Sequence, residues 1–94
     1  MLTKKLVERK KISFSIDAPY ASKVMLVGDF NNWDKANTPL KKSAKVSAWR
    51  KDLTLKPGKY QYKFLVDGNW MIDPSNSKKS VNSFGTENSI VEVI

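Results

Sequence analysis

The chain has 94 residues, of which 40% are hydrophobic and 28% charged, a balance that indicates one folded domain and excludes a multidomain enzyme. It contains neither Cys nor His, which excludes disulfide frameworks, thiolate metal sites, cysteine nucleophiles and histidine-based triads. Seventeen Lys and Arg against nine Asp and Glu give a net charge of +8, which suits anionic partners but is better explained by solvated, solubilising lysines. No apolar run reaches 18 residues, so we expect a soluble, cytoplasmic protein without a membrane partner.

Short runs of alternating apolar and polar residues predict β-strands along the whole chain. The first strand is expected at Lys11–Asp17, where apolar residues occupy every second position. Lys23–Gly28 is continuously apolar in its centre, as expected of a strand covered on both faces. Asp29–Asp34 is rich in Asp and Asn and predicts a turn. Lys41–Lys45 fits either a short edge strand or a loop.

The next predicted strand is Val46–Leu55, in which Trp49 shares its face with apolar residues and is therefore assigned to packing. Pro57-Gly58 predicts a tight hairpin turn into the following strand, Lys59–Val66. The alternation in that strand predicts an inward face made of Tyr62, Phe64 and Val66.

The last third of the chain begins with Asp67-Gly68, a strong signal for a hairpin turn into a short strand at Trp70–Ile72. Asn76–Asn88 is a long polar segment and is predicted to be a loop. Ser89–Ile94 is expected to be the final strand. No helical pattern is convincing, so we predict an antiparallel β-sandwich of six to eight strands over residues 11–94, preceded by a basic arm at 1–10.

The acidic residues do not suggest catalysis. Asp29, Asp34, Asp67 and Asp73 lie in segments rich in Gly, Asn or Pro, where carboxylates cap turns. The glycines are scattered, so there is no phosphate-binding loop, and no acidic cluster has the spacing of a cation site. We therefore expect no enzyme activity, no catalytic residues, no metal and no cofactor.

Two tryptophans, Trp33 and Trp70, follow predicted turns rather than lying in strand centres. An exposed indole offers a flat apolar face for stacking on a sugar ring or a base. Alternatively, the two rings cap the ends of the sandwich core. Position alone leaves both interpretations open.

The segment Val24–Trp33, VMLVGDFNNW, resembles the opening signature of the glycogen-binding domain of AMP-activated protein kinase β subunits. The same type of module occurs N-terminally in glucan branching enzymes and isoamylases. The resemblance continues through Pro57–Trp70, Asp73-Pro74 and Phe84–Val91. These blocks occur in the family order and cover most of the chain, from Ser15 onward.

The resemblance implies an immunoglobulin-like sandwich of the early-set type that binds α-1,4-linked glucans such as glycogen or starch and has no activity of its own. It also implies a glycogen-metabolising enzyme or a kinase as a protein partner. Trp33 and Trp70 resemble the two stacking tryptophans of the family, and both are expected to be substantially exposed. The other expected binding residues are Lys63, which resembles a lysine that reaches sugar hydroxyls, Thr86 and Asn88, which resemble a hydrogen-bonding pair, and Phe84, where kinase subunits carry an aliphatic residue.

Two other functions compete with glucan binding. The domain fits a protein-interaction module that has kept the sandwich and lost sugar binding. The lysines together with the aromatic residues fit nucleic-acid binding by stacking. No nucleic-acid motif accompanies the lysines, so no specific nucleic-acid partner is expected.

Overall fold

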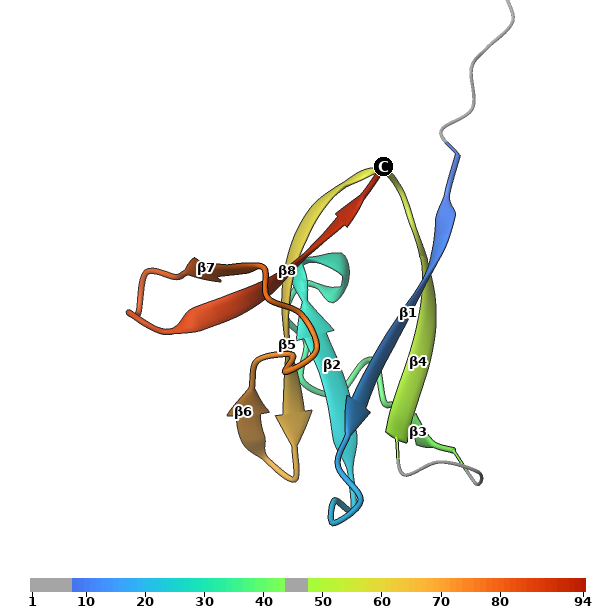
Figure 1. The fold of residues 1–94 in the computed structure, drawn as a ribbon, viewed down its shortest axis with the longest axis vertical. Coiled ribbons are helices and arrows are strands. Elements are labelled where there is room, and N and C mark those ends of the chain that lie inside the picture. The colour runs from blue at the N-terminus through green and yellow to red at the C-terminus, as the bar shows by residue number, and fades with distance from the viewer. Residues whose placement is uncertain (1–7, 44–47) are drawn as a thin grey trace, which may run out of the picture.

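The computed structural model describes residues 8–43 and 48–94 and contains two antiparallel β-sheets, which confirms the predicted β-sandwich (Figure 1). The smaller sheet has the strand order β1-β4-β3, with β1 at Lys10–Asp17, β3 at Lys41–Lys42 and β4 at Ala48–Leu55. The N-terminal part of the expected basic arm, residues 1–7, and the segment 44–47 lie outside the described residues.

The larger sheet has five strands and is centred on β5 (Gly58–Val66). On one side β5 pairs with β2 (Val24–Gly28). On the other side its first half pairs with β8 (Glu87–Val93) and its last residues pair with β6 (Asn69–Met71). The edge strand β7 (Lys79–Val81) pairs with β8, and together they form a hairpin that extends away from the sandwich (Figure 1).

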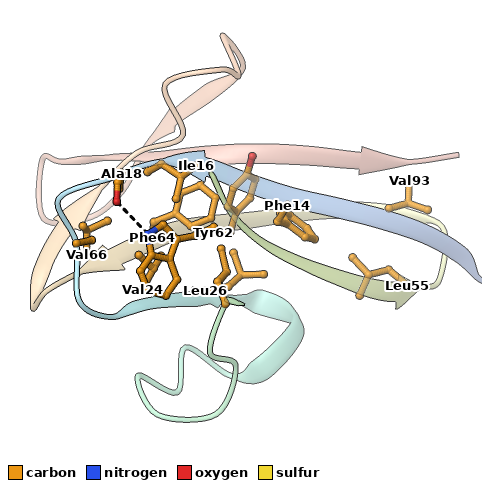
Figure 2. Close-up of a cluster of buried hydrophobic side chains, with 13 residues drawn as sticks. Phe14, Ile16, Ala18, Val24, Leu26, Leu55, Tyr62, Phe64, Val66 and Val93 are labelled. Atoms are coloured by element: carbon orange, nitrogen blue, oxygen red, sulfur yellow. Dashed lines mark hydrogen bonds between the residues drawn. The ribbon is translucent and has the colours of Figure 1, made fainter. Parts of the chain in front are cut away.

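The core lies between the two sheets and follows the predicted alternation (Figure 2). In β1, Phe14 and Ile16 are buried, whereas the serines between and before them are exposed. In β5 the inward side chains are Tyr62, Phe64 and Val66, as predicted. Phe64 is completely buried and meets the Tyr62 ring edge-on at 5.9 Å between centroids. Phe14 of β1 also lies edge-on to the Tyr62 ring, at 5.1 Å between centroids, so aromatic rings join the two sheets.

Trp49 belongs to the core, which confirms its assignment to packing. The side chain is 9% exposed, and its indole nitrogen Nε1 donates a hydrogen bond of 2.9 Å to the carbonyl oxygen of Ala18 (Figure 2). A buried indole needs such an acceptor, because an unpaired buried N–H is costly.

The hairpin predicted at Pro57-Gly58 is wrong, because the chain crosses there from one sheet to the other. β4 pairs with β1 and β3, whereas β5 pairs with β2, β6 and β8. Gly58 has φ 152°, a backbone conformation that a side chain would strain. The Tyr60 hydroxyl also donates to the carbonyl oxygen of Lys56 and fixes the crossover. A tight-turn signal does not reveal whether the two strands pair or stack face to face.

The hairpin predicted at Asp67-Gly68 is confirmed, since β5 and β6 pair from Val66 and Asn69 onward. Asp67 has φ 48° and Gly68 has φ 84°, as the favoured two-residue turn requires. The Asp67 carboxylate accepts hydrogen bonds from the backbone nitrogens of Ser22 and Lys23, which ties this turn to the β1–β2 connection.

The long loop predicted at Asn76–Asn88 is wrong in part, because it contains β7 and the start of β8. β7 is an edge strand whose side chains do not face the core, so it carries no apolar alternation that could reveal it. The final strand accordingly begins earlier than the predicted Ser89, at Glu87. Within the described residues no helix has the length and apolar character to cross a membrane, and the helical content is one short 3-10 turn, η1 (Asp29–Asn31).

Candidate functional site

The outer face of β5 forms the floor of a cleft of about 560 Å³. Gln61 and Lys63 point to this face because their neighbours in the strand point to the core. The η1 turn, strand β6 and the tip of the β7–β8 hairpin surround them. The residues that line the cleft are Asp29, Trp33, Gln61, Lys63, Trp70, Asn82, Phe84, Thr86 and Asn88.

The cleft brings together every site residue predicted from the sequence, and of the two tryptophans expected to be exposed only Trp70 is. Trp70 is 45% exposed and Phe84 is 89% exposed, so both rings are open to a ligand. Trp33 is half-buried rather than substantially exposed. Asn88 is only 6% exposed, because other cleft residues cover and bind its side-chain amide.

Gly28 allows the η1 turn to lie directly against β5. A Cβ atom at this position would come within 2.6 Å of the Gln61 carbonyl oxygen and 2.8 Å of the Tyr62 Cβ. The turn itself is held by Asn31, whose Oδ1 accepts from the Gly28 nitrogen and whose Nδ2 donates to the Leu26 carbonyl oxygen. Gly28 and Asn31 thus fix where the segment that carries Trp33 begins relative to β5.

Trp33 is held in a backbone conformation that bulky residues avoid. Asn32 and Trp33 both have φ 57°, in the left-handed region. Such conformations persist where surrounding contacts enforce them, and they cluster at functional sites. The Trp33 nitrogen donates to the Gly28 carbonyl oxygen at 2.9 Å. The indole Nε1 donates to Asp29 Oδ1 at 2.8 Å, which anchors the ring at the edge of the cleft.

Trp70 lies on β6, directly opposite Leu65 of β5. The Lys35 ammonium lies over the Trp70 ring, 5.9 Å from its centroid, at the outer limit of a cation–π contact. Lys35 lies two positions after Trp33, so the loop that carries Trp33 also contacts Trp70.

A hydrogen-bond network links β5 to the β7–β8 hairpin along the polar side of the cleft. The Thr86 hydroxyl accepts from Lys63 Nζ at 3.1 Å and from Asn82 Nδ2 at 2.7 Å. A hydroxyl that accepts two hydrogen bonds keeps its own hydrogen for donation. Asn88 Nδ2 donates to Gln61 Oε1 at 2.9 Å, so Asn88 orients another cleft residue.

Asn82 shapes the tip of the hairpin. Its Oδ1 accepts from the backbone nitrogens of Phe84 and Thr86, at 2.9 and 3.1 Å. The Asn82 backbone nitrogen donates to the Thr86 carbonyl oxygen, which closes the turn. These bonds fix a turn that presents an almost fully exposed Phe84 ring at the rim of the cleft.

A buried polar cluster braces β5 from its inner side. The Tyr62 hydroxyl donates to Asp73 Oδ2 at 2.7 Å, and Ser89 Oγ accepts from the Asp73 nitrogen. Asn76 Nδ2 donates both to the Tyr62 hydroxyl and to the Ile90 carbonyl oxygen. Burial raises the pKa of the Tyr62 hydroxyl above its ordinary range, and the nearby Asp73 carboxylate adds to that rise. The cluster ties the chain after β6 to β8.

Sequence reasoning missed three cleft residues, Asp29, Gln61 and Asn82. Gln61 could have been found, because it lies two positions before Lys63 and therefore on the same face of the strand. Asn82 and Asp29 were harder to find. Their role depends on hydrogen bonds to Thr86 and Gln61, which the sequence does not show. In the sequence alone, both residues are accounted for by their place in turn-rich segments.

The cleft is suited to a neutral ligand with flat apolar faces and polar edges. Three aromatic rings, Trp33, Trp70 and Phe84, supply the apolar surface. Amides, a hydroxyl and an ammonium supply hydrogen bonds beside them. One lysine and one aspartate line the cleft, so their charges offset each other.

Comparisons with known proteins find a matching family and several similar chains. Residues 13–94 match the family model described as the glycogen recognition site of AMP-activated protein kinase. A similar protein is 5'-AMP-activated protein kinase subunit beta-1 of Sus scrofa, 44% identical over 70 residues, which are 74% of this chain and 53% of that one. Another is 1,4-alpha-glucan branching enzyme GlgB of Aquifex aeolicus, 42% identical over 66 residues, which are 67% of this chain and 10% of that one.

Two further matches come from a plant protein and from a solved structure. Protein PTST homolog 2, chloroplastic, of Arabidopsis thaliana is 39% identical over 71 residues, which are 76% of this chain and 13% of that one. The crystal structure of maltogenic amylase from S. marinus superposes with a TM-score of 0.75 and 25% identity, over 92% of this chain and 14% of that chain. The chain thus corresponds to only part of each of these proteins.

Proposed function

Since the chain belongs to the family of glycogen recognition sites of AMP-activated protein kinase, we propose that its cleft binds α-1,4-linked glucan and catalyses no reaction. The main support for the proposal is that one cleft of about 560 Å³ contains three aromatic rings together with several polar groups that can hydrogen-bond to sugar hydroxyls. That volume lies within the range usual for ligand sites.

The proposed binding mode assigns each group a part. A glucan chain has apolar sugar faces, which stack on Trp33 and Trp70. Its hydroxyl edges meet Lys63 and the Thr86 hydroxyl, which still has a hydrogen to donate. Phe84, at the rim, covers a further sugar face. Asn88 acts through Gln61, because its amide is already engaged there.

The cleft favours a modest affinity. It is open to solvent, and much of the recognition runs through hydroxyl groups that water also binds. A glycogen-like polymer compensates because it offers many copies of the same ligand, which raises overall retention by avidity.

The similar proteins support an α-1,4-linked glucan as the ligand and suggest the kind of protein partner. One is a 1,4-alpha-glucan branching enzyme, and another is a kinase subunit. We propose that this domain likewise brings an associated or covalently joined enzyme to α-glucan. The kinase subunits also keep a second function open, in which the domain serves as a protein-interaction module without sugar binding.

Affinity gel electrophoresis tests the proposal directly. The protein is run through native gels that contain glycogen, amylose or, as a control, a soluble β-1,4-glucan. Glycogen and amylose should retard the protein and the β-linked polymer should not. Equal mobility in all gels would overturn glucan binding and favour the interaction module.

A further inference from the structure

Asp29 occupies the position where strand β2 ends and its partner β5 continues. The last residue pair between the two strands is Gly28 with Tyr62. The next position on β5 is Gln61, whose backbone nitrogen has no β2 carbonyl to bind. Asp29 Oδ2 accepts from that nitrogen at 2.7 Å, so a side chain extends the ladder by one position.

The second oxygen of the same carboxylate holds the indole of Trp33. Asp29 Oδ1 accepts from Trp33 Nε1 at 2.8 Å. The carboxylate therefore bridges the main chain of β5, which is the cleft floor, and the edge of one aromatic wall. Trp33 has φ 57°, a conformation that bulky residues avoid, so surrounding contacts such as this bond must hold it in place.

We propose that Asp29 is the positioning residue of the cleft, orienting the Trp33 indole for stacking on a glucan. The inference rests on the proposed glucan-binding function. One carboxylate oxygen holds the indole and the other holds the strand backbone, so the proposed effect of Asp29 on binding runs through the orientation of Trp33 rather than through direct contact with the sugar.

The first test needs no glucan. In a ¹⁵N–¹H correlation spectrum, Asp29→Ala should shift the indole N–H signal of Trp33 and speed its exchange with water. The indole signal of Trp49, which is bonded to the Ala18 carbonyl oxygen in the core, should stay in place as an internal control. A Trp33 signal that does not change would overturn the proposal.

The second test is a double-mutant cycle on maltoheptaose affinity, measured by isothermal titration calorimetry. Asp29→Ala should weaken binding about tenfold in the parent protein, as expected for loss of a charge-assisted hydrogen bond. In a Trp33→Phe background, which keeps a ring and lacks the N–H, the same change should weaken binding less than about twofold. Equal losses in both backgrounds would mean that Asp29 acts through Gln61 or touches the sugar, and would overturn the positioning role.

Asp34→Ala serves as the matched control, because the Asp34 carboxylate in the same loop accepts from the Ala36 nitrogen and is not among the residues that line the cleft. Its maltoheptaose affinity should equal that of the parent. The two proposals fail in different ways. A parent protein that binds no maltoheptaose would refute the glucan-binding function. If the parent binds but the Trp33 signal of the Asp29→Ala variant is undisturbed, only the role of Asp29 is refuted.

Discussion

The Lys63 ammonium donates a hydrogen bond to the Thr86 hydroxyl across 3.1 Å, which joins the central strand β5 to the β7–β8 hairpin. The two residues are 23 positions apart in the chain, and their contact sets the distance between the floor and one side of the cleft. The polar side of the cleft therefore depends on tertiary packing rather than on one loop.

Lys63→Met tests the polar side. Methionine keeps most of the aliphatic stem and loses the ammonium, so maltoheptaose affinity should fall about three- to tenfold, with little change in melting temperature. The matched control is Lys59→Met, a substitution in the same strand at an exposed position outside the cleft. Calorimetry measures the affinity of both variants. Parental affinity in the Lys63→Met variant would show that Lys63 does not contribute to glucan binding.

Glucan binding should depend little on salt. The sugar is neutral and the two charges that line the cleft offset each other, so amylose retention should change less than about twofold between about 50 and 200 mM salt. Binding to duplex DNA, where it occurs, should fall steeply over the same range, because each phosphate contact releases counterions. A collapse of amylose retention would show that the site depends on charge.

The sequence predicted the fold because alternation and turn residues are local patterns, whereas the candidate site residues came from the resemblance to the kinase module. Period-two alternation identified the inward face of β5, which contains Phe64, and the opposite face, which contains Lys63. The positive-φ demand of a two-residue hairpin identified Asp67-Gly68. The resemblance to the kinase module selected the six residues that the fold gathers in one cleft.

What could not be predicted depends on contacts between distant segments. Pro57-Gly58 signals a turn, but the partners of the strands on either side decide that it crosses between sheets. The composition of the segment around Asp29 suggests a turn cap, and the carboxylate instead bridges Gln61 and Trp33. Asn88 was expected to bind sugar directly, but its side chain is buried against Gln61, so we propose an indirect part for it.

Phe64→Ala tests the core. Phe64 is completely buried between the sheets, so truncation should lower the free energy of unfolding by about 3–5 kcal/mol. Leu65→Ala, one position along on the half-buried outer face, should cost clearly less. Denaturant titration measures both, and a loss below about 1 kcal/mol for Phe64→Ala would contradict the assigned packing.

The two cleft tryptophans differ as probes of stacking. Trp33 is half-buried and bonded to Asp29, so Trp33→Ala should reduce both glucan affinity and stability. Trp70 is 45% exposed and is not among the residues packed against the core, so its removal should affect stability little. Trp49→Ala provides the opposite case, a large loss of stability from the core with no direct effect on the cleft.

The affinity of the Trp70→Ala variant for maltoheptaose, measured by calorimetry beside thermal unfolding, tests the glucan-binding cleft most directly. Stacking on an aromatic ring contributes about 1–3 kcal/mol by analogy with nucleic-acid bases, so binding should weaken by about one to two orders of magnitude. The melting temperature should stay close to that of the parent. Parental affinity in a folded Trp70→Ala variant would contradict the claim that this cleft binds glucan by aromatic stacking.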